Sequence, residues 1–142
     1  MTNPTTITKG IQDYLKTYPP LADGVYLDFV GEYPTEYAIV MLPELEKIEE
    51  YLVSGGVYGR HFLLNMRAAT NEDADRLLNN GFYEEFAEWL NSQTEAGTLP
   101  SLPTGFTALS IEALSNGFLM ESSEVLSTAI YSINCRLVYE RN

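Results

Sequence analysis

One stretch of the sequence, residues 70–97, constrains the fold more than any other, because it is the longest helical pattern in the chain. Its apolar residues recur at three- and four-residue intervals, the spacing that places side chains on one buried face of a helix. Gly97 is a typical helix stop. Three of the apolar side chains are aromatic, so the helix needs a broad partner surface, which we expect neighbouring β-strands to supply. The predicted buried face comprises Ala74, Leu77, Leu78, Phe82, Phe86, Trp89 and Leu90, and the predicted solvent face carries Glu84, Glu85, Glu88 and Glu95.

Alternating apolar and polar residues predict strands on both sides of this helix. We expect the first two strands to form a hairpin, and Pro43 to end the second one. Residues 46–53 fit either a short helix or a strand. We favour the strand, because Gly55-Gly56 would turn it back onto the strand that follows. The predicted strands are residues 25–30, 36–42, 57–69, 106–114, 118–120 and 128–141.

The remaining segments complete an α+β domain. Residues 5–18 form an amphipathic helical pattern that Pro19-Pro20 ends. Residues 98–105 contain two prolines, which favour an extended crossing loop. The last strand has an apolar face opposite a mixed one, as in a sheet covered by helices on one side. We therefore predict one domain over residues 1–142, a largely antiparallel β-sheet with two main helices packed on one face.

The charge balance excludes several classes of partner. The 142 residues carry 20 acidic and 8 basic side chains, for a formal net charge of −12. Tight binding to nucleic acid or to an anionic membrane needs clustered Lys and Arg, which this chain lacks. A single cysteine cannot form an intrachain disulfide, which favours a reducing compartment. The N-terminus has no signal-peptide core, and the longest apolar run is too short to span a membrane, so we expect a soluble product made inside the cell.

No catalytic, cofactor or metal site stands out from the sequence. His61 is the only histidine, and we expect a structural or interface role, the alternative being catalysis with an acid distant in sequence. Cys135 falls on the apolar face of the last strand, so we expect a buried thiol. The glycines at 55, 56 and 59 lack the Gly-Lys-Ser/Thr ending of a phosphate loop and fit a hairpin tip instead. The strand arginines Arg60, Arg67 and Arg136 could form internal salt bridges or contact an acidic neighbouring subunit.

Four segments in order carry a resemblance to a known family. They are YLKTYPPLADG, the strand GRHFLLNMRA feeding NEDADRLLNNGFYEEFAEWLNSQ, the loop GTLPSLPTG, and the closing YSINCRLVYER. Together they resemble the minor capsid or tail terminator proteins of siphophages that infect Gram-positive bacteria. The resemblance covers nearly the whole chain. Its most specific residues are Gly81, Phe82, Tyr83, Glu84, Glu85, Phe86 and Trp89, then Leu99-Pro100 and Cys135-Arg136-Leu137.

The resemblance implies a protein that acts by assembly, without catalysis, cofactor, metal or membrane. Tail terminators form a ring, usually of six copies, on the head-proximal end of the tail tube. The ring stops polymerisation of the tube protein and offers a surface to the head–tail connector or stopper. DNA passes through its lumen without specific binding. The expected location is the virion, at the junction of tail and neck, and the host cytoplasm during assembly. The alternatives are a head-completion or stopper protein of the neck and, in a different class, a small hydrolase using His61.

Two segments are candidates for contacts between subunits. Hairpin tips and strand edges recruit partners because their backbone groups are open to pairing. We select the tip at residues 54–60 and the loop at 98–105, the alternative being that both are ordinary turns. The candidate interface residues are Ser54, Gly55, Gly56, Val57, Tyr58, Arg60, Leu99, Pro100, Leu102 and Pro103.

Overall fold

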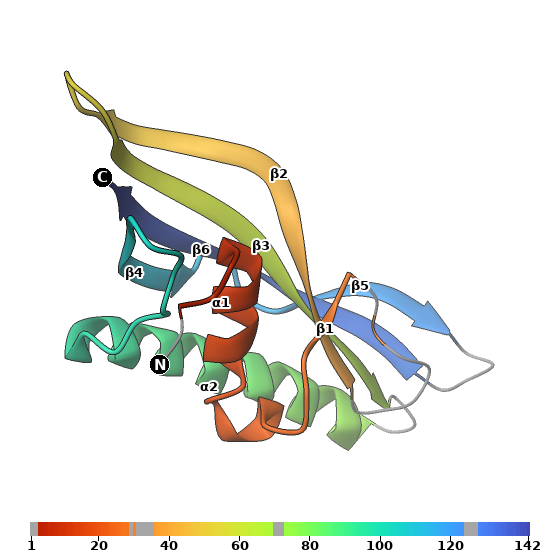
Figure 1. Ribbon diagram of the computed structural model, residues 1–142. Helices are drawn as coiled ribbons and strands as arrows, with labels where there is room; N and C mark the ends of the chain where they lie inside the picture. The colour runs from red at the N-terminus through yellow and green to blue at the C-terminus, as the bar shows by residue number, and fades with distance from the viewer. Residues whose placement is uncertain (1–2, 29, 31–35, 70–72, 124–127) are drawn as a thin grey trace.

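The computed structural model describes residues 3–28, 30, 36–69, 73–123 and 128–142, with the backbone alone at 73–78, 80 and 123. The fold is α+β, as predicted, with a largely antiparallel sheet and both main helices on one of its faces (Figure 1). In chain order the elements are α1 (Ile7–Leu15), the 3-10 turn η1 (Pro19–Leu21), β1 (Tyr26–Leu27), β2 (Glu36–Glu50), β3 (Gly56–Ala69), α2 (Asp73–Ala96), β4 (Phe106–Ala113), β5 (Phe118–Ser123) and β6 (Thr128–Arg141).

Three long strands form the centre of the sheet, and two shorter ones share an edge. The strand order is β1-β2-β3-β6-β4, and β5 also pairs with β6. β4 pairs with the second half of β6 and β5 with its first half, so the two lie in line along the same edge. Between them, Leu114 N–H donates to Asn134 O at 2.6 Å and Asn134 N–H donates to Ser115 Oγ at 3.1 Å. These bonds keep the edge continuous across the gap.

The predicted hairpin of the first two strands is wrong. β1 has only two residues and pairs in parallel with β2, Tyr26 opposite Ala38 and Leu27 opposite Ile39. Its end coincides with Asp28, which has a positive φ of 69°. Apolar alternation reads the same in either strand direction, so the pattern could not reveal parallel pairing. Residues 29 and 31–34 of the predicted strand and turn lie outside the described residues.

Pro43 does not end the second strand, contrary to the sequence prediction. β2 continues through it to Glu50, and its register against β3 shifts between Met41 and Leu45. Within the described residues β1 covers the outer edge of β2 only at Ala38 and Ile39, so the missing N–H of Pro43 costs no ladder bond there. The alternative of a short helix at 46–53 is wrong, because β2 runs to Glu50 and pairs with β3 as a hairpin.

Helix α2 is anchored in the sheet by Tyr83, which lies beside the predicted apolar stripe rather than in it. Tyr83 is only 1% exposed, and its hydroxyl lies 3.0 Å from Leu64 O and 2.9 Å from Tyr131 O. Burial raises the pKa of this phenol, which therefore keeps its proton and remains a donor. A Cβ on Gly117 would lie 2.5 Å from the Tyr83 ring, so a glycine is needed where the edge strand passes it.

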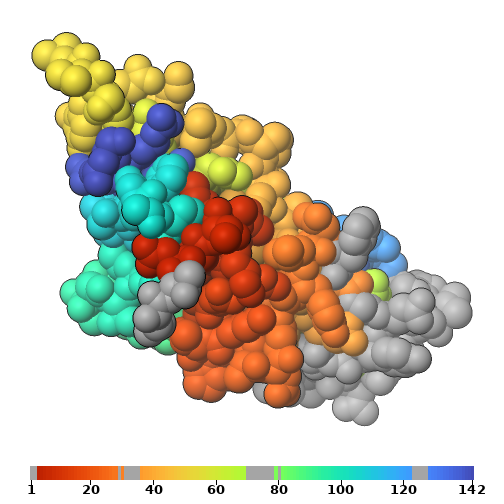
Figure 2. All heavy atoms as spheres, viewed as in Figure 1, coloured from red at the N-terminus to blue at the C-terminus, as the bar shows by residue number. Residues whose placement is uncertain are grey.

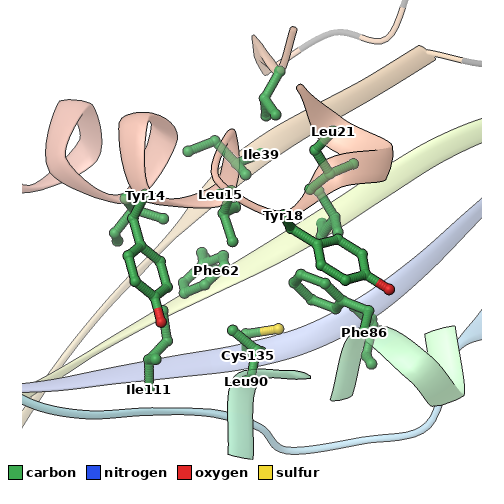
Figure 3. Packing of buried hydrophobic residues seen from close by; sticks show 14 of the residues in the cluster. Tyr14, Leu15, Tyr18, Leu21, Ile39, Phe62, Phe86, Leu90, Ile111 and Cys135 are labelled. Atoms are coloured by element: carbon green, nitrogen blue, oxygen red, sulfur yellow. The ribbon is translucent and has the colours of Figure 1, made fainter. Parts of the chain in front are cut away.

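The predicted aromatic stripe of α2 meets α1 as well as the sheet (Figure 3). Phe86 and Leu90 are fully buried, whereas Phe82 and Trp89 are half-buried. The ring centroid of Tyr14 on α1 lies 5.3 Å from that of Trp89, and the ring centroid of Tyr18, in the turn after α1, lies 5.6 Å from that of Phe86. The predicted solvent face of α2 is exposed, and the side chains of residues 74, 77 and 78 lie outside the described residues. Aromatic contacts thus join the two helices over the sheet.

The buried contacts of Tyr83 predict how substitutions at this position change stability. Tyr83→Ala should lower the free energy of unfolding by about 3–5 kcal/mol, because it removes a large buried ring. Tyr83→Phe should cost about 0.5–1.5 kcal/mol, because only the hydrogen bond is lost. Urea denaturation measures both, with Tyr26→Ala as the control, since Tyr26 is 53% exposed. Equal losses at Tyr83→Ala and Tyr26→Ala would contradict the assignment.

Candidate interaction surfaces

The tip of the β2–β3 hairpin displays apolar side chains to solvent. The hairpin extends beyond the helices, and its tip, yellow in Figure 2, projects from the body of the molecule (Figures 1 and 2). Leu52 and Val53 at the tip are wholly exposed, and Leu45, Ile48 and Tyr51 behind them are each at least one-third exposed. Isolated exposed apolar residues are ordinary, but a cluster on a projecting turn marks a surface for contact.

The tip has a fixed shape because it packs against the end of β6. Gly55 has φ of +80°, and a Cβ there would lie 2.1 Å from Arg141 O. Tyr51 N–H donates to Gly55 O at 3.0 Å and closes the turn. The Tyr51 hydroxyl also donates to the Glu140 carboxylate, which raises the pKa of Tyr51 to about 12. Leu52 and Val53 are therefore held on a preformed turn.

A groove of about 890 Å³ lies on the helical side of the molecule. Its walls come from the segment before α1, from α1 itself, from the C-terminal half of α2 and from the loop at 98–105. Half-buried Trp89 and Leu99 contribute apolar surface, and Lys9 and Ser101 are exposed polar residues of its lining. Such a groove can take a small group of aliphatic side chains.

The loop wall of the groove is pinned to α1. The Tyr14 hydroxyl donates to Thr98 O at 2.8 Å, and burial raises the pKa of Tyr14 to about 12, so the donor is retained. A Cβ on Gly10 would lie 2.4 Å from Ser101 O, which shows how closely the loop approaches the helix. Leu102 is buried in the core beneath it. The groove is consequently preformed.

The structure separates the ten predicted interface residues into exposed and buried ones. Tyr58 and Leu102 belong to the hydrophobic core, and Gly56 and Pro100 are buried as well, so these four offer little surface to a partner. Ser54 is exposed, and Gly55, Val57, Arg60, Leu99 and Pro103 are half-buried. The prediction did not include Leu52 and Val53, the most exposed apolar residues of the tip. Their position directly before Ser-Gly-Gly is the signal that could have found them.

The face of the sheet away from the helices carries a ladder of charges across four strands. Glu46 on β2 lies beside His61 on β3, with His61 Nε2 3.3 Å from Glu46 Oε1. Arg136 on β6 donates to that same Glu46 oxygen at 3.1 Å. On its other side Arg136 donates twice to Glu112 Oε1 on β4, from Nε at 3.2 Å and from a terminal nitrogen. The carboxylate paired with His61 is thus shared with an arginine.

The ladder fits a structural role for His61. The hydrogen bond from Arg136, followed by that from His61, holds the pKa of Glu46 below its usual range. Glu112 and then Glu46 raise the pKa of Arg136. Within the described part of the chain, Glu46 is the one side chain that hydrogen-bonds the His61 ring, and none of the four ladder residues lines the groove. Arg136 forms the internal salt bridges that were one of its two predicted roles.

The same uncovered face holds polar atoms that lack hydrogen-bond partners. Asn65 Oδ1 and Ser132 Oγ lie on directly paired positions of β3 and β6, and Asn134 Oδ1 is two residues further along. All three atoms are buried and unpaired. A buried polar group without a partner costs about 1–3 kcal/mol.

Cys135 is fully buried on the helical face of the sheet, as predicted, and burial raises the pKa of its thiol, so it is an inert core residue. The residues that the structure describes contain no group of three His, Cys, Asp or Glu side chains able to hold a metal ion. Among the described helices, none combines the length and apolarity needed to cross a membrane.

No protein-family model matches the chain, and none of the curated proteins compared with it matches significantly.

The charge ladder predicts a pH-dependent contribution to stability. Because the folded-state pKa of Glu46 is depressed, its stabilising effect is present above the unfolded value of about 4.3 and is lost as pH falls through the folded pKa. The difference in unfolding free energy between wild type and Glu46→Gln should therefore shrink as pH falls through that range. Chemical denaturation between pH 3 and pH 7 measures it.

Glu49→Gln is the matched control for this experiment, because Glu49 is exposed and forms no ion pair within the described residues. A Glu46→Gln effect that does not change with pH, or that Glu49→Gln reproduces, would contradict the role of the ladder.

Proposed function

We propose that this protein is a non-enzymatic phage tail terminator. It assembles as a ring on the head-proximal end of the tail tube, with six copies as in the family it resembles. The ring stops tube polymerisation and joins the tail to the connector or stopper of the neck. The proposal rests on the resemblance of four ordered segments and on the surfaces that the fold leaves exposed.

The observation that carries the proposal is the projecting hairpin tip. Leu52 and Val53 are wholly exposed on a turn that the end of β6 holds in place. Leaving two aliphatic side chains in water forgoes about 1.5–3 kcal/mol for each, relative to burying it. A protein that works alone gains nothing from this arrangement, whereas a subunit of an assembly regains that free energy on contact.

A second apolar surface lies at the opposite edge of the sheet. Five hydrophobic side chains of β4, β5 and the segment between them are each more than two-fifths exposed, at Leu109, Leu114, Phe118, Leu119 and Met120. Strand β6 lies between this edge and the β2–β3 hairpin. Two distinct surfaces suit a subunit that contacts ring neighbours and also the tube or the connector.

The acidic surface supports passage of DNA without binding. The formal net charge is −12, and Glu84, Glu85 and Glu88 are exposed along α2. In a ring, carboxylates that face the lumen repel the DNA backbone, so that DNA slides through.

Tails made without this protein test the proposal against the stopper alternative. A missing terminator should give over-long tubes, because nothing ends polymerisation, whereas a missing stopper leaves tube length normal. Electron microscopy of tails from a phage lacking the gene measures tube length directly. Expression of the wild-type protein in the same host is the control and should restore normal length. Tubes of normal length without the protein would contradict the terminator assignment.

The hydrolase alternative has one observation in its favour, the Glu46 carboxylate beside His61. Under our proposal His61→Ala should leave tail assembly intact, because the residue only supports the ladder. Phage yield from a host that supplies the variant measures this. Loss of yield from a variant that still folds and still binds tube ends would favour catalysis instead.

A further inference from the structure

Resting on the ring proposed above, we infer that its subunit contact joins two different surfaces. The hairpin tip of one copy, with Leu52 and Val53, enters the groove of the next copy between α1, the end of α2 and the loop at 98–105. The inserting side chains lie directly before the segment 54–60 selected from the sequence, and the selected loop at 98–105 forms one wall of the receiving groove.

The tip cannot be covered by its own chain. Leu52 and Val53 are wholly exposed, while Tyr51 and Gly55 are tied to the end of β6. The turn is therefore not free to fold back onto the body. Only another molecule can remove these side chains from water.

The groove provides space and apolar surface for the side chains of the tip. It has about 890 Å³ of space, with Trp89 and Leu99 presenting apolar surface and Pro4 at its rim. The bond from Tyr14 to Thr98 and the close approach of Gly10 to Ser101 hold it open without a ligand. Two preformed surfaces lose little conformational entropy when they meet.

Apolar contact, rather than charge, carries this interface. Lys9 and Asp13 both line the groove and pair with each other at 2.8 Å, so the receiving surface is locally neutral there. At the base of the tip, Glu49 is exposed and has no ion-pair partner among the described residues, and Glu50 pairs with Lys47 at 3.3 Å.

The difference between the two surfaces determines the symmetry. Contact between identical patches gives a two-fold dimer, whereas contact between two different surfaces runs head to tail and forms a ring when the rotation from copy to copy closes. The tip is also small compared with the roughly 800 Å² that each partner buries in a standard interface. A pair of copies should therefore be weak, and ring closure, in which every copy makes two contacts, supplies the stability.

Disulfide trapping tests the contact directly. Leu52→Cys places a thiol on the tip, and Ser101→Cys places one on the loop wall of the groove, where Ser101 is exposed. The native Cys135 is buried, so its thiol should not form a disulfide with the introduced cysteines. Oxidation of a mixture of the two variants in the presence of tail tubes should give cross-linked dimers, and the double variant should give a ladder of higher oligomers. Glu84→Cys mixed with Leu52→Cys is the control and should give none.

A second pair of variants keeps the inference testable if the thiols fail to react. Leu52→Glu with Val53→Glu should lower the yield of rings by about tenfold or more, with an unchanged melting curve, because both side chains are solvent-exposed in the subunit. Asn91→Glu is the matched control and should assemble as wild type, because Asn91 is exposed on the solvent face of α2, away from both the tip and the groove.

The outcomes separate the two proposals. If the cysteine variants form rings but no cross-link, and the double glutamate variant also forms rings, the proposed contact is wrong. The terminator assignment would still stand. A wild-type protein that never assembles, alone or on purified tube ends, overturns both.

Discussion

The seating of α2 on the sheet through Tyr83 is the interaction on which the rest of the structure depends. The buried ring and its hydroxyl fix the helix against the backbone of β3 and β6, and Gly117 is the residue that lets the edge strand pass it. Because α2 is placed in this way, its end at Gly97, where φ is +76°, sends the following loop across to α1. The position of the loop that forms one wall of the groove therefore depends on the seating of Tyr83.

The unequal lengths of helix and strands explain the projecting tip. The 24 residues of α2 span roughly 36 Å, whereas the 14 residues of β3 can span roughly 46 Å. A helix of that length cannot cover the whole sheet, and the uncovered end is the β2–β3 hairpin. Here acidic residues on β2 surround a small apolar tip, which is the composition of a contact surface with a polar rim.

Sequence patterns gave the regular elements well and the tertiary pairings poorly. Alternation predicted β3, β4 and β6 to within a residue or so, because one face of each strand packs under the helices. It could not predict the parallel pairing of β1, because the alternation of apolar and polar residues is the same whichever way a strand runs. Tyr83 was missed because an amphipathic side chain beside the stripe does not stand out as core. The partner of His61 was hidden as well, because Glu46 lies 15 residues away in sequence and reaches His61 only through the register of β2 against β3.

The candidate surfaces were predictable only in part, for a related reason. Gly-rich and Pro-rich segments reveal turns, but whether a turn is exposed depends on what packs over it. Tyr58 and Leu102 are covered by their own core, while Leu52 and Val53, which a hydropathy pattern would place inside, are bare. Electron-microscopic reconstruction of the protein on tail-tube ends is the most direct test of assembly through these surfaces. Our account predicts a closed ring in which every hairpin tip lies against the helices of the neighbouring copy. Tube ends that carry no ring, or a ring whose tips all point into solvent, would contradict it.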